Sequence, residues 1–368
     1  MQTNHIRRLG AAVLMLLWLG LAAAGWVFPP KDLSETERRP LAQMPQASVQ
    51  SLLNGSFMKD FETGALDQFP ARDSFRKLKA LVHYYVLNQS DNNDVYLEDG
   101  FAAKLEYPLH TDAVDMAVAR LNYVYEKYLK DTDVNLYASV IPDKGYYLAE
   151  ENGYPAMDYE KLFSAVREGL PWATYVPLEQ ALTIEDYYKT DIHWRQEKLL
   201  PVAQTLAQAM GVTVAEAKSY TAEALERPFY GVYYGQAALP MDADLMYLMK
   251  NPVTEGCTVY DYETSKNTAV YDMDKLTSKD LYDVFLSGSK SLLTIENPNA
   301  QTDRELIVFR DSFAGSLAPL LLQDYARITL VDIRYISTEV LGNFLEFTDQ
   351  DVLFLYCTTV LNTKGILR

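Results

Sequence analysis

Apolar positions change their spacing along the chain, and each spacing predicts a type of element. Apolar residues follow one another over residues 9–28, and about 20 of them are enough to cross a bilayer as a helix. Over residues 112–129 they recur at the three- and four-residue spacing of an amphipathic helix, whereas residues 134–141 form a short apolar run that ends at Pro142. Such a short run is typical of a buried strand.

Predicted strands and helices then alternate. Helices are predicted at residues 158–168, 196–210 and 313–322, and strands at 134–141, 175–178, 305–309, 327–331 and 352–356. This alternation predicts an α/β fold with a mostly parallel sheet. The stretch from about 212 to 300 breaks the alternation, because it is rich in tyrosine, turns and short apolar runs. We interpret it as an inserted segment that covers one end of the sheet.

The N-terminal segment predicts export. Arg7 and Arg8 precede the apolar run, as in a signal peptide or a signal anchor. The run is longer than the about 7 to 15 residues of a cleaved signal, which favours an uncleaved anchor with its basic residues in the cytoplasm. Cleavage near Ala24, which would give a secreted protein, is the alternative. We expect residues 1–28 to be the anchor or signal, 29–56 a proline-containing tether, and 57–368 one extracytoplasmic domain.

Composition excludes some functions. The formal net charge is -17, so we expect no nucleic-acid partner, because phosphates would repel such a surface. The two cysteines, Cys257 and Cys357, lie in no metal-binding spacing. The sequence therefore predicts no metal and no cofactor, and it leaves open whether the two cysteines form a disulfide.

Two short segments carry a carboxylate, an imidazole and a hydroxyl. Asp191 lies two residues before His193, and Ser312 follows the apolar run 306–309. The other three histidines lie in the basic leader or beside no candidate nucleophile, which leaves His193 as the candidate general base. These are the three groups of a nucleophilic acyl-transfer site. The structural alternatives are a buried histidine stacked near Trp194 and a serine that caps the next helix.

Both segments follow predicted strands. In open α/β sheets the ligand crevice lies beyond the carboxyl ends of the strands, which is where both segments are expected. His193 would take the proton of Ser312 as the hydroxyl attacks an ester, and Asp191 would hold the imidazole. The Ser312 backbone N–H is the one oxyanion donor that the sequence indicates. An acyl-serine then forms, and water or a sugar hydroxyl resolves it, so the same residues serve an esterase or a transferase.

Residues 188–194, Tyr-Lys-Thr-Asp-Ile-His-Trp, resemble the signature of the DHHW proteins. That family is similar to the SGNH-hydrolase-like domains of the alginate O-acetylation proteins. Further segments resemble family blocks in the same order, at residues 67–73, 140–144, 229–231, 283–286 and 310–313. The resemblance covers most of the predicted exported body. This chain departs from the pattern at Ile192, where the family has its first histidine.

The resemblance implies an SGNH-hydrolase-like three-layer α/β/α fold with a circularly permuted motif order. It also implies that Asp191, His193 and Ser312 are the triad, since the alginate-type domains share the order Asp, His, Ser. Ordinary SGNH enzymes have separate Gly and Asn oxyanion donors, and the sequence assigns neither of them to a position of this chain.

Five further residues are weaker candidates for substrate binding. Trp194, Tyr233 and Tyr234 would stack on a glycan, with packing in the core or a hairpin as the alternative. Lys144 would bind an anionic sugar, with a solvated loop as the alternative. Arg310 would pair with a substrate carboxylate or with Asp311, and a surface ion pair is the alternative.

Together these features predict a membrane-anchored, extracytoplasmic SGNH-like O-acyltransferase that O-acetylates a cell-envelope or exported polysaccharide. A membrane partner protein would present the acyl donor, because acetyl-CoA is not available outside the cell. The alternatives are a carbohydrate esterase with the same triad, and a non-catalytic glycan-binding or assembly protein that keeps the fold.

Overall fold

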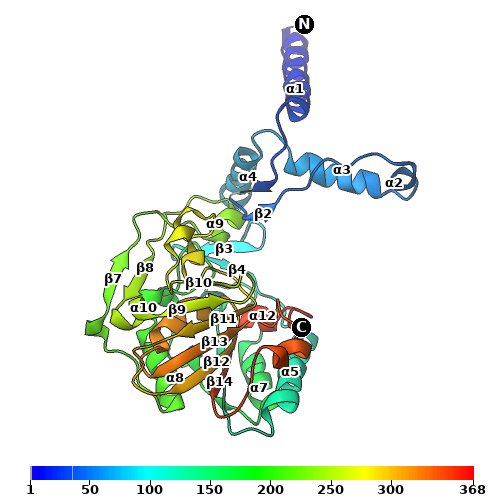
Figure 1. Ribbon diagram of the computed structural model, residues 1–368. Coiled ribbons are helices and arrows are strands. Elements are labelled where there is room, and N and C mark those ends of the chain that lie inside the picture. Colours follow the sequence, from blue (N-terminus) through cyan, green and yellow to red (C-terminus); the bar gives the residue numbers. More distant parts are fainter. Residues whose placement is uncertain (1, 35) are drawn as a thin grey trace. The chain divides into compact units, whose positions relative to one another are not determined.

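The computed structural model describes residues 2–34 and 36–368 and divides the chain into two compact units (Figure 1). The first unit holds the residues up to Asn93 together with Tyr234–Pro240. The second unit holds Asp94–Tyr233 and Met241–Arg368. All three residues of the predicted triad belong to the second unit.

The first unit begins with a long apolar helix, α1 (Gln2–Val27). Its segment Arg7–Gly25 is 19 residues long with a mean hydropathy of 1.7. By length and composition this segment is able to cross a membrane, and a signal sequence near the N-terminus has the same properties.

The rest of the first unit consists of short elements fastened by ion pairs. They are β1 (Leu33–Ser34), β2 (Arg39–Pro40), α2 (Val49–Leu53), α3 (Ser56–Asp67), α4 (Arg72–Leu81) and the π-helix η1 (Val82–Val86). Asp67, at the end of α3, accepts hydrogen bonds from Arg39 at 2.8 and 2.6 Å and from the Ala42 N–H at 2.9 Å. The Arg39 hydrogen bond lowers the pKa of Asp67 to about 2. The carboxylate therefore ties the segment that contains β2 to α3.

An eight-stranded sheet forms the centre of the second unit. Its strand order is β10-β9-β11-β13-β12-β14-β5-β6. The strands span β10 (Lys266–Thr268), β9 (Thr258–Asp261), β11 (Leu292–Glu296), β13 (Tyr325–Val331), β12 (Arg304–Arg310), β14 (Asp351–Cys357), β5 (Asn135–Ile141) and β6 (Thr174–Tyr175). The five strands from β13 to β6 pair in parallel, and β10, β9 and β11 are antiparallel to their neighbours.

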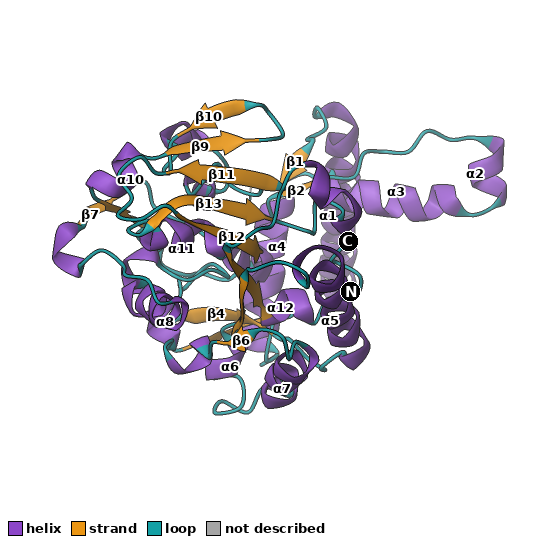
Figure 2. Cartoon of the chain, turned by 60° about the horizontal axis from the view of Figure 1, so that its bottom comes forward, coloured by secondary structure: helices purple, strands orange, loops and turns teal. Residues whose placement is uncertain are grey.

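Helices cover the sheet on either side of its central strands (Figure 2). They span α5 (Thr111–Val124), α6 (Gly145–Leu148), α7 (Tyr159–Gly169), α8 (Leu200–Met210), α10 (Pro252–Gly256), α11 (Ala314–Leu317) and α12 (Thr358–Leu361), while α9 (Val232–Ala237) crosses the boundary between the units. Two small antiparallel pairs complete the unit, β3 (Val95–Glu98) with β4 (Phe101–Lys104) and β7 (Thr221–Ala224) with β8 (Tyr247–Lys250).

The central strands are buried on both faces, which explains why their sequences are runs of apolar residues. Every residue of β14 is buried, as are the last five residues of β12. Strands covered on both faces are apolar throughout rather than alternating, and residues 306–309 and 352–356 show this pattern. The predicted α/β fold with a mostly parallel sheet is confirmed. The segment 212–300 does more than cover one end of the sheet, because β9, β10 and β11 extend the sheet itself.

Candidate active site

A narrow loop at residues 187–194 presents Asp191 and His193. Tyr187 and Trp194 form an antiparallel bridge at its base, and the Tyr188 N–H donates to the His193 carbonyl at 3.0 Å. The loop is too tight for a regular strand pair, so its remaining backbone groups need partners from outside. Asp244 supplies one of these partners.

The Asp244 carboxylate accepts three hydrogen bonds from the loop. They come from the Lys189 N–H at 2.9 Å, the Thr190 N–H at 2.8 Å and the Thr190 hydroxyl at 2.5 Å. A carboxylate that accepts several backbone N–H groups fixes the conformation of the segment that donates them. Asp244 therefore holds the loop immediately before Asp191.

Asp191, His193 and Ser312 form one hydrogen-bonded network. His193 Nε2 lies 2.8 Å from Ser312 Oγ, and His193 Nδ1 lies 2.6 Å from Asp191 Oδ1. Asp191 Oδ1 also accepts from the His193 backbone N–H at 3.1 Å. These distances agree with the geometry expected from the sequence, in which each ring nitrogen faces one of the other two side chains. Asp191 and His193 are buried, and Ser312 is partly exposed.

The second oxygen of Asp191 is held by a segment that the sequence did not single out for chemistry. Asp191 Oδ2 accepts from the Val232 N–H at 2.9 Å, and the Gly231 N–H donates to Thr190 Oγ1 at 2.9 Å. The approach is so close that a Cβ on Gly231 would overlap the Cα and Cβ of Asp191. The only signal in the sequence was the family block at residues 229–231.

Ser312 lies in the turn between β12 and α11. The preceding residue, Asp311, accepts from the Phe313 N–H at 3.0 Å and from the Cys357 N–H at 2.6 Å. Since Cys357 ends β14, the neighbour of β12, this carboxylate ties the turn to the edge of the sheet. The Ser312 hydroxyl is therefore presented by a rigid strand end.

Tyr282 supports the imidazole and was not predicted. Its ring stacks on His193 with centroids 3.8 Å apart and an interplanar angle of 8°. Its hydroxyl lies 2.7 Å from Ser316 Oγ, which also accepts from Trp194 Nε1 at 2.9 Å. The ring position of His193 is thus fixed by a face contact as well as by Asp191. Tyr282 lies one residue before the family block at 283–286, which is the nearest signal in the sequence.

Trp194 and Tyr233 lie in the interior. Trp194 is 0% exposed, and Tyr233 is 5% exposed. A ring that stacks on a sugar needs an open face, so the prediction that these two rings bind a glycan is wrong, and their packing alternative holds. Tyr234 follows Tyr233 in α9 but belongs to the first unit, and its contact with substrate stays a prediction.

Lys144 is buried as well. It is 2% exposed, so the alternative of a solvated loop lysine is wrong. Its Nζ donates to the carbonyls of Tyr188 at 3.0 Å and Lys189 at 3.1 Å. These are contacts within the protein, and they give no support to the predicted binding of an anionic sugar.

Arg310 is 1% exposed, which rules out the surface ion pair. It donates to the backbone carbonyl of Asp311 at 3.3 Å and to that of Lys290 at 3.2 Å. Among the described residues, none accepts a hydrogen bond from its Nε. Burial lowers the pKa of the guanidinium from its usual value. A pairing of Arg310 with a substrate carboxylate stays a prediction.

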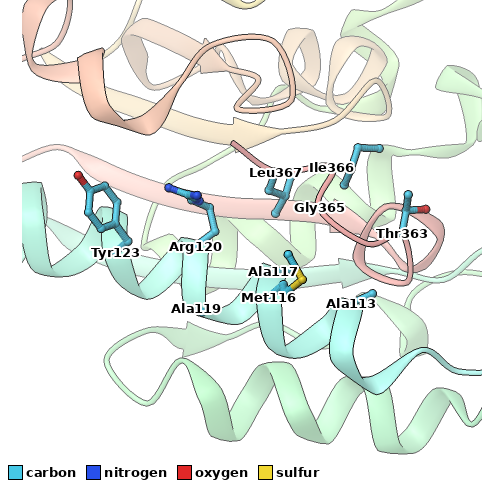
Figure 3. Close-up of a pocket in the computed structure, with 10 residues that line it drawn as sticks. All are labelled: Ala113, Met116, Ala117, Ala119, Arg120, Tyr123, Thr363, Gly365, Ile366 and Leu367. Atoms are coloured by element: carbon cyan, nitrogen blue, oxygen red, sulfur yellow. The ribbon is translucent and has the colours of Figure 1, made fainter.

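A surface groove of about 350 Å³ lies between α5 and the C-terminal segment (Figure 3). It is lined by Ala113, Met116, Ala117, Ala119, Arg120, Tyr123, Thr363, Gly365, Ile366 and Leu367. None of the three network residues lines it, so the groove is separate from the candidate active site.

The cysteines are both free and buried. Within residues 2–34 and 36–368, no group of three or more His, Cys, Asp and Glu side chains is placed to hold a metal ion.

Comparison with known proteins identifies structural relatives. No protein-family model and no curated protein matches the chain. Among solved structures, a DHHW family protein from Eubacterium siraeum matches with a TM-score of 0.57 and 23% identity, over 75% of this chain and 94% of that one. Bacillus cereus PatB1 with a sulfonyl adduct matches with a TM-score of 0.57 and 17% identity, over 74% and 97%. The O-acetyltransferase domain of Pseudomonas putida AlgJ matches at 0.44 and 16%, over 73% and 92%.

At these identities the first two matches establish the fold. The arrangement of the mostly parallel sheet and its helices thus belongs to a known architecture. The resemblance expected from residues 188–194 is confirmed: the chain is similar in fold to a DHHW family protein and to PatB1.

Proposed function

We propose that the chain is an extracytoplasmic O-acyltransferase that transfers an acetyl group to a cell-envelope or exported polysaccharide through an acyl-Ser312 intermediate. The observation that carries the proposal is the network in which Ser312 Oγ lies 2.8 Å from His193 Nε2 and Asp191 lies 2.6 Å from His193 Nδ1. A nucleophile, a base and a group that orients the base at these distances are the parts of covalent acyl transfer.

The first half of the reaction acylates the serine. Ser312 Oγ attacks the carbonyl carbon of an acyl ester while His193 Nε2 takes the hydroxyl proton. Asp191 accepts the Nδ1–H, which fixes the tautomer and stabilises the imidazolium. The bond to the donor oxygen then breaks, and His193 returns the proton to that leaving group. The Ser312 backbone N–H is the candidate donor to the oxyanion.

The second half deacylates the serine. A sugar hydroxyl loses its proton to His193 Nε2 and attacks the acyl carbon, and Ser312 leaves as the free hydroxyl after it regains that proton. Water in place of the sugar would give hydrolysis with the same groups. The proposed reaction is therefore defined by the acceptor.

The proposed location follows from α1. We infer that this helix remains in the membrane, with residues 29–368 outside the cytoplasm and a membrane protein presenting the acyl donor. The apolar segment Arg7–Gly25 supports an anchor by its length and composition.

Labelling of Ser312 tests the nucleophile. PatB1 has been solved with a sulfonyl adduct, so we choose a sulfonyl fluoride as the probe, with mass spectrometry to locate it. The adduct is expected on Ser312, and Ser312→Ala and His193→Ala are expected to abolish it. Ser219→Ala, an exposed serine outside the network, is the matched control and should label normally. A wild-type chain that stays unlabelled would favour the non-catalytic alternative.

Product analysis tests the acceptor. The chain is incubated with an acetyl ester, with and without an acetyl-free oligosaccharide. Acetylated oligosaccharide that depends on Ser312 supports transfer, whereas acetate formed at the same rate with and without the sugar identifies an esterase. Loss of one network residue is expected to lower the rate by about 10³-fold or more.

A further inference from the structure

Lys144 is a buried amine in contact with the loop that carries Asp191. It follows β5 and lies at the N-terminus of α6, at the carboxyl edge of the parallel strands. Its Nζ is within hydrogen-bond distance of two backbone carbonyls, those of Tyr188 and Lys189. These carbonyls lie three and two residues before Asp191. The lysine therefore reaches from one strand end to the loop that carries the acid of the network.

The surroundings of Lys144 make its burial costly. The aromatic ring of Tyr233 lies 5.0 Å from Nζ and that of Phe101 lies 6.0 Å away. Burial lowers the pKa of Lys144 to about 7, against the charges of Asp191, Asp244 and Asp143, which favour the ammonium. An apolar side chain of similar length would fill the same space without this desolvation cost. A lysine at this position is therefore explained if the N–H groups of its Nζ have a role that an apolar side chain cannot fill.

The loop before Asp191 is held from two sides. Asp244 accepts from its N–H groups, as described above, whereas Lys144 donates to its carbonyls. The Lys189 carbonyl has a second donor, the Ala102 N–H at 2.8 Å. The Tyr188 carbonyl accepts a hydrogen bond from Lys144 Nζ. The backbone N–H of the same residue donates to the His193 carbonyl, so Lys144 holds a residue that is bonded directly to the base.

We propose that Lys144 is a positioning residue: its Nζ holds the carbonyls of Tyr188 and Lys189 and thereby keeps Asp191 against His193 Nδ1. This inference rests on the proposed function of the Ser312 network. Lys144 touches none of the reacting atoms in this role, since it acts through the loop.

Replacement of the donor tests the proposal. Lys144→Met keeps the length and removes the N–H groups. We expect the rate of Ser312 sulfonylation to fall by at least 10-fold, and kcat for acetyl-ester turnover to fall with KM unchanged. Lys161→Met, at an exposed lysine in α7, is the matched control. Leu121→Ala, in the core contact of α5, controls for lost stability, because it lowers the melting temperature without touching the loop.

Chemical rescue separates the donor from simple packing. Lys144→Ala leaves room for a small molecule, so n-propylamine is added at pH 6 and compared with n-propanol at the same concentration. Recovery of the sulfonylation rate by the amine alone supports the proposal. Equal recovery by both compounds would show that only the volume matters and would overturn it.

A spectroscopic readout keeps the test independent of turnover. A His Nδ1–H bonded to a carboxylate gives a downfield proton signal, which we expect in the wild type and in Lys161→Met but not in Lys144→Met. A signal and a sulfonylation rate that are unchanged in folded Lys144→Met would refute the role of Lys144. A wild type that shows the signal but no Ser312 labelling would instead contradict the proposed function.

Discussion

Gly231 has no side chain, and this allows Asp191 to lie directly against the backbone of residue 231. A Cβ at Gly231 would lie 2.5 Å from the Asp191 nitrogen and would overlap its Cα and Cβ. These atoms belong to the backbone or lie next to it, so they cannot move aside as the end of a flexible side chain does. The two segments touch only because position 231 has no side chain.

Gly231→Ala is therefore expected to move the Asp191 carboxylate away from His193 and to lower the rate of Ser312 sulfonylation by about 10²-fold or more, since the imidazole loses the group that orients it. Gly315→Ala is the matched control, because a Cβ there would meet Phe285 at an ordinary 3.8 Å. Wild-type labelling by Gly231→Ala would contradict the claimed close approach.

Lys144 also predicts a dependence of stability on pH. Its pKa falls from 10.5 in the unfolded chain to about 7, so between these values the unfolded chain binds more protons than the native one. The free energy of unfolding must then rise with pH. Asp143, whose pKa burial raises to about 6, acts in the opposite direction only below pH 7.

We expect urea denaturation of the wild type to show a gain of about 2 kcal/mol between pH 7 and pH 9 relative to Lys144→Met. The variant provides the baseline for every other titrating group. A difference between the two proteins that stays constant over this range would contradict a depressed pKa.

Residues with reactive groups were predictable, and residues that only position them were not. Asp191, His193 and Ser312 carry the required chemistry in recognisable spacings. Tyr282 and Gly231 act through packing against residues far away in the sequence, and no local pattern encodes such contacts. The prediction that Trp194 stacks on a sugar was wrong because aromatic side chains, which bind glycans at some sites, also pack in protein cores.

Among the elements, the loop 187–194 depends on Asp244. Asp244→Ala removes the acceptor of three hydrogen bonds. We expect it to lower the free energy of unfolding by about 1–3 kcal/mol, since the N–H of buried Thr190 loses its partner whereas that of exposed Lys189 can bond to water, and to slow Ser312 labelling. Asp242→Ala, at an exposed carboxylate nearby, should change neither. Chemical denaturation and labelling of both variants check this, and equal stability of the two would refute it.

The elements themselves show what periodicity encodes. The central strands were predictable to within about two residues, because burial on both faces leaves an apolar run. The antiparallel extension by β9, β10 and β11 was not, since its partners are set by contacts across the sheet rather than by local spacing. The helix predicted at 313–322 is the short α11 followed by a 3-10 turn over Ala318–Leu321 that begins next to Pro319.

For the whole molecule, the anchor makes a clear prediction. The full chain is expected in the membrane fraction and is expected to resist alkaline extraction, whereas a chain that lacks residues 1–28 should remain in the supernatant. The reason is the apolar segment Arg7–Gly25, because burying it in lipid binds the chain to the membrane more tightly than a peripheral contact would. A mature N-terminus near residue 25, found by mass spectrometry, would show a cleaved signal instead.

The sheet order has a consequence for how the protein is made. β14 lies between β12 and β5, and Asn135 bonds Asp351 at 3.0 Å across a separation of 216 residues. On the ribosome, β5 and β6 are complete long before β14 exists, so the edge of β5 that will pair with β14 stays unpaired and exposed to aggregation. Pairings between such distant segments form late. Because Asp311 binds the N–H at the end of β14, the turn that presents Ser312 is completed only then. The segment 351–357 must therefore join the sheet before the hydrogen bond that fixes the Ser312 turn can form.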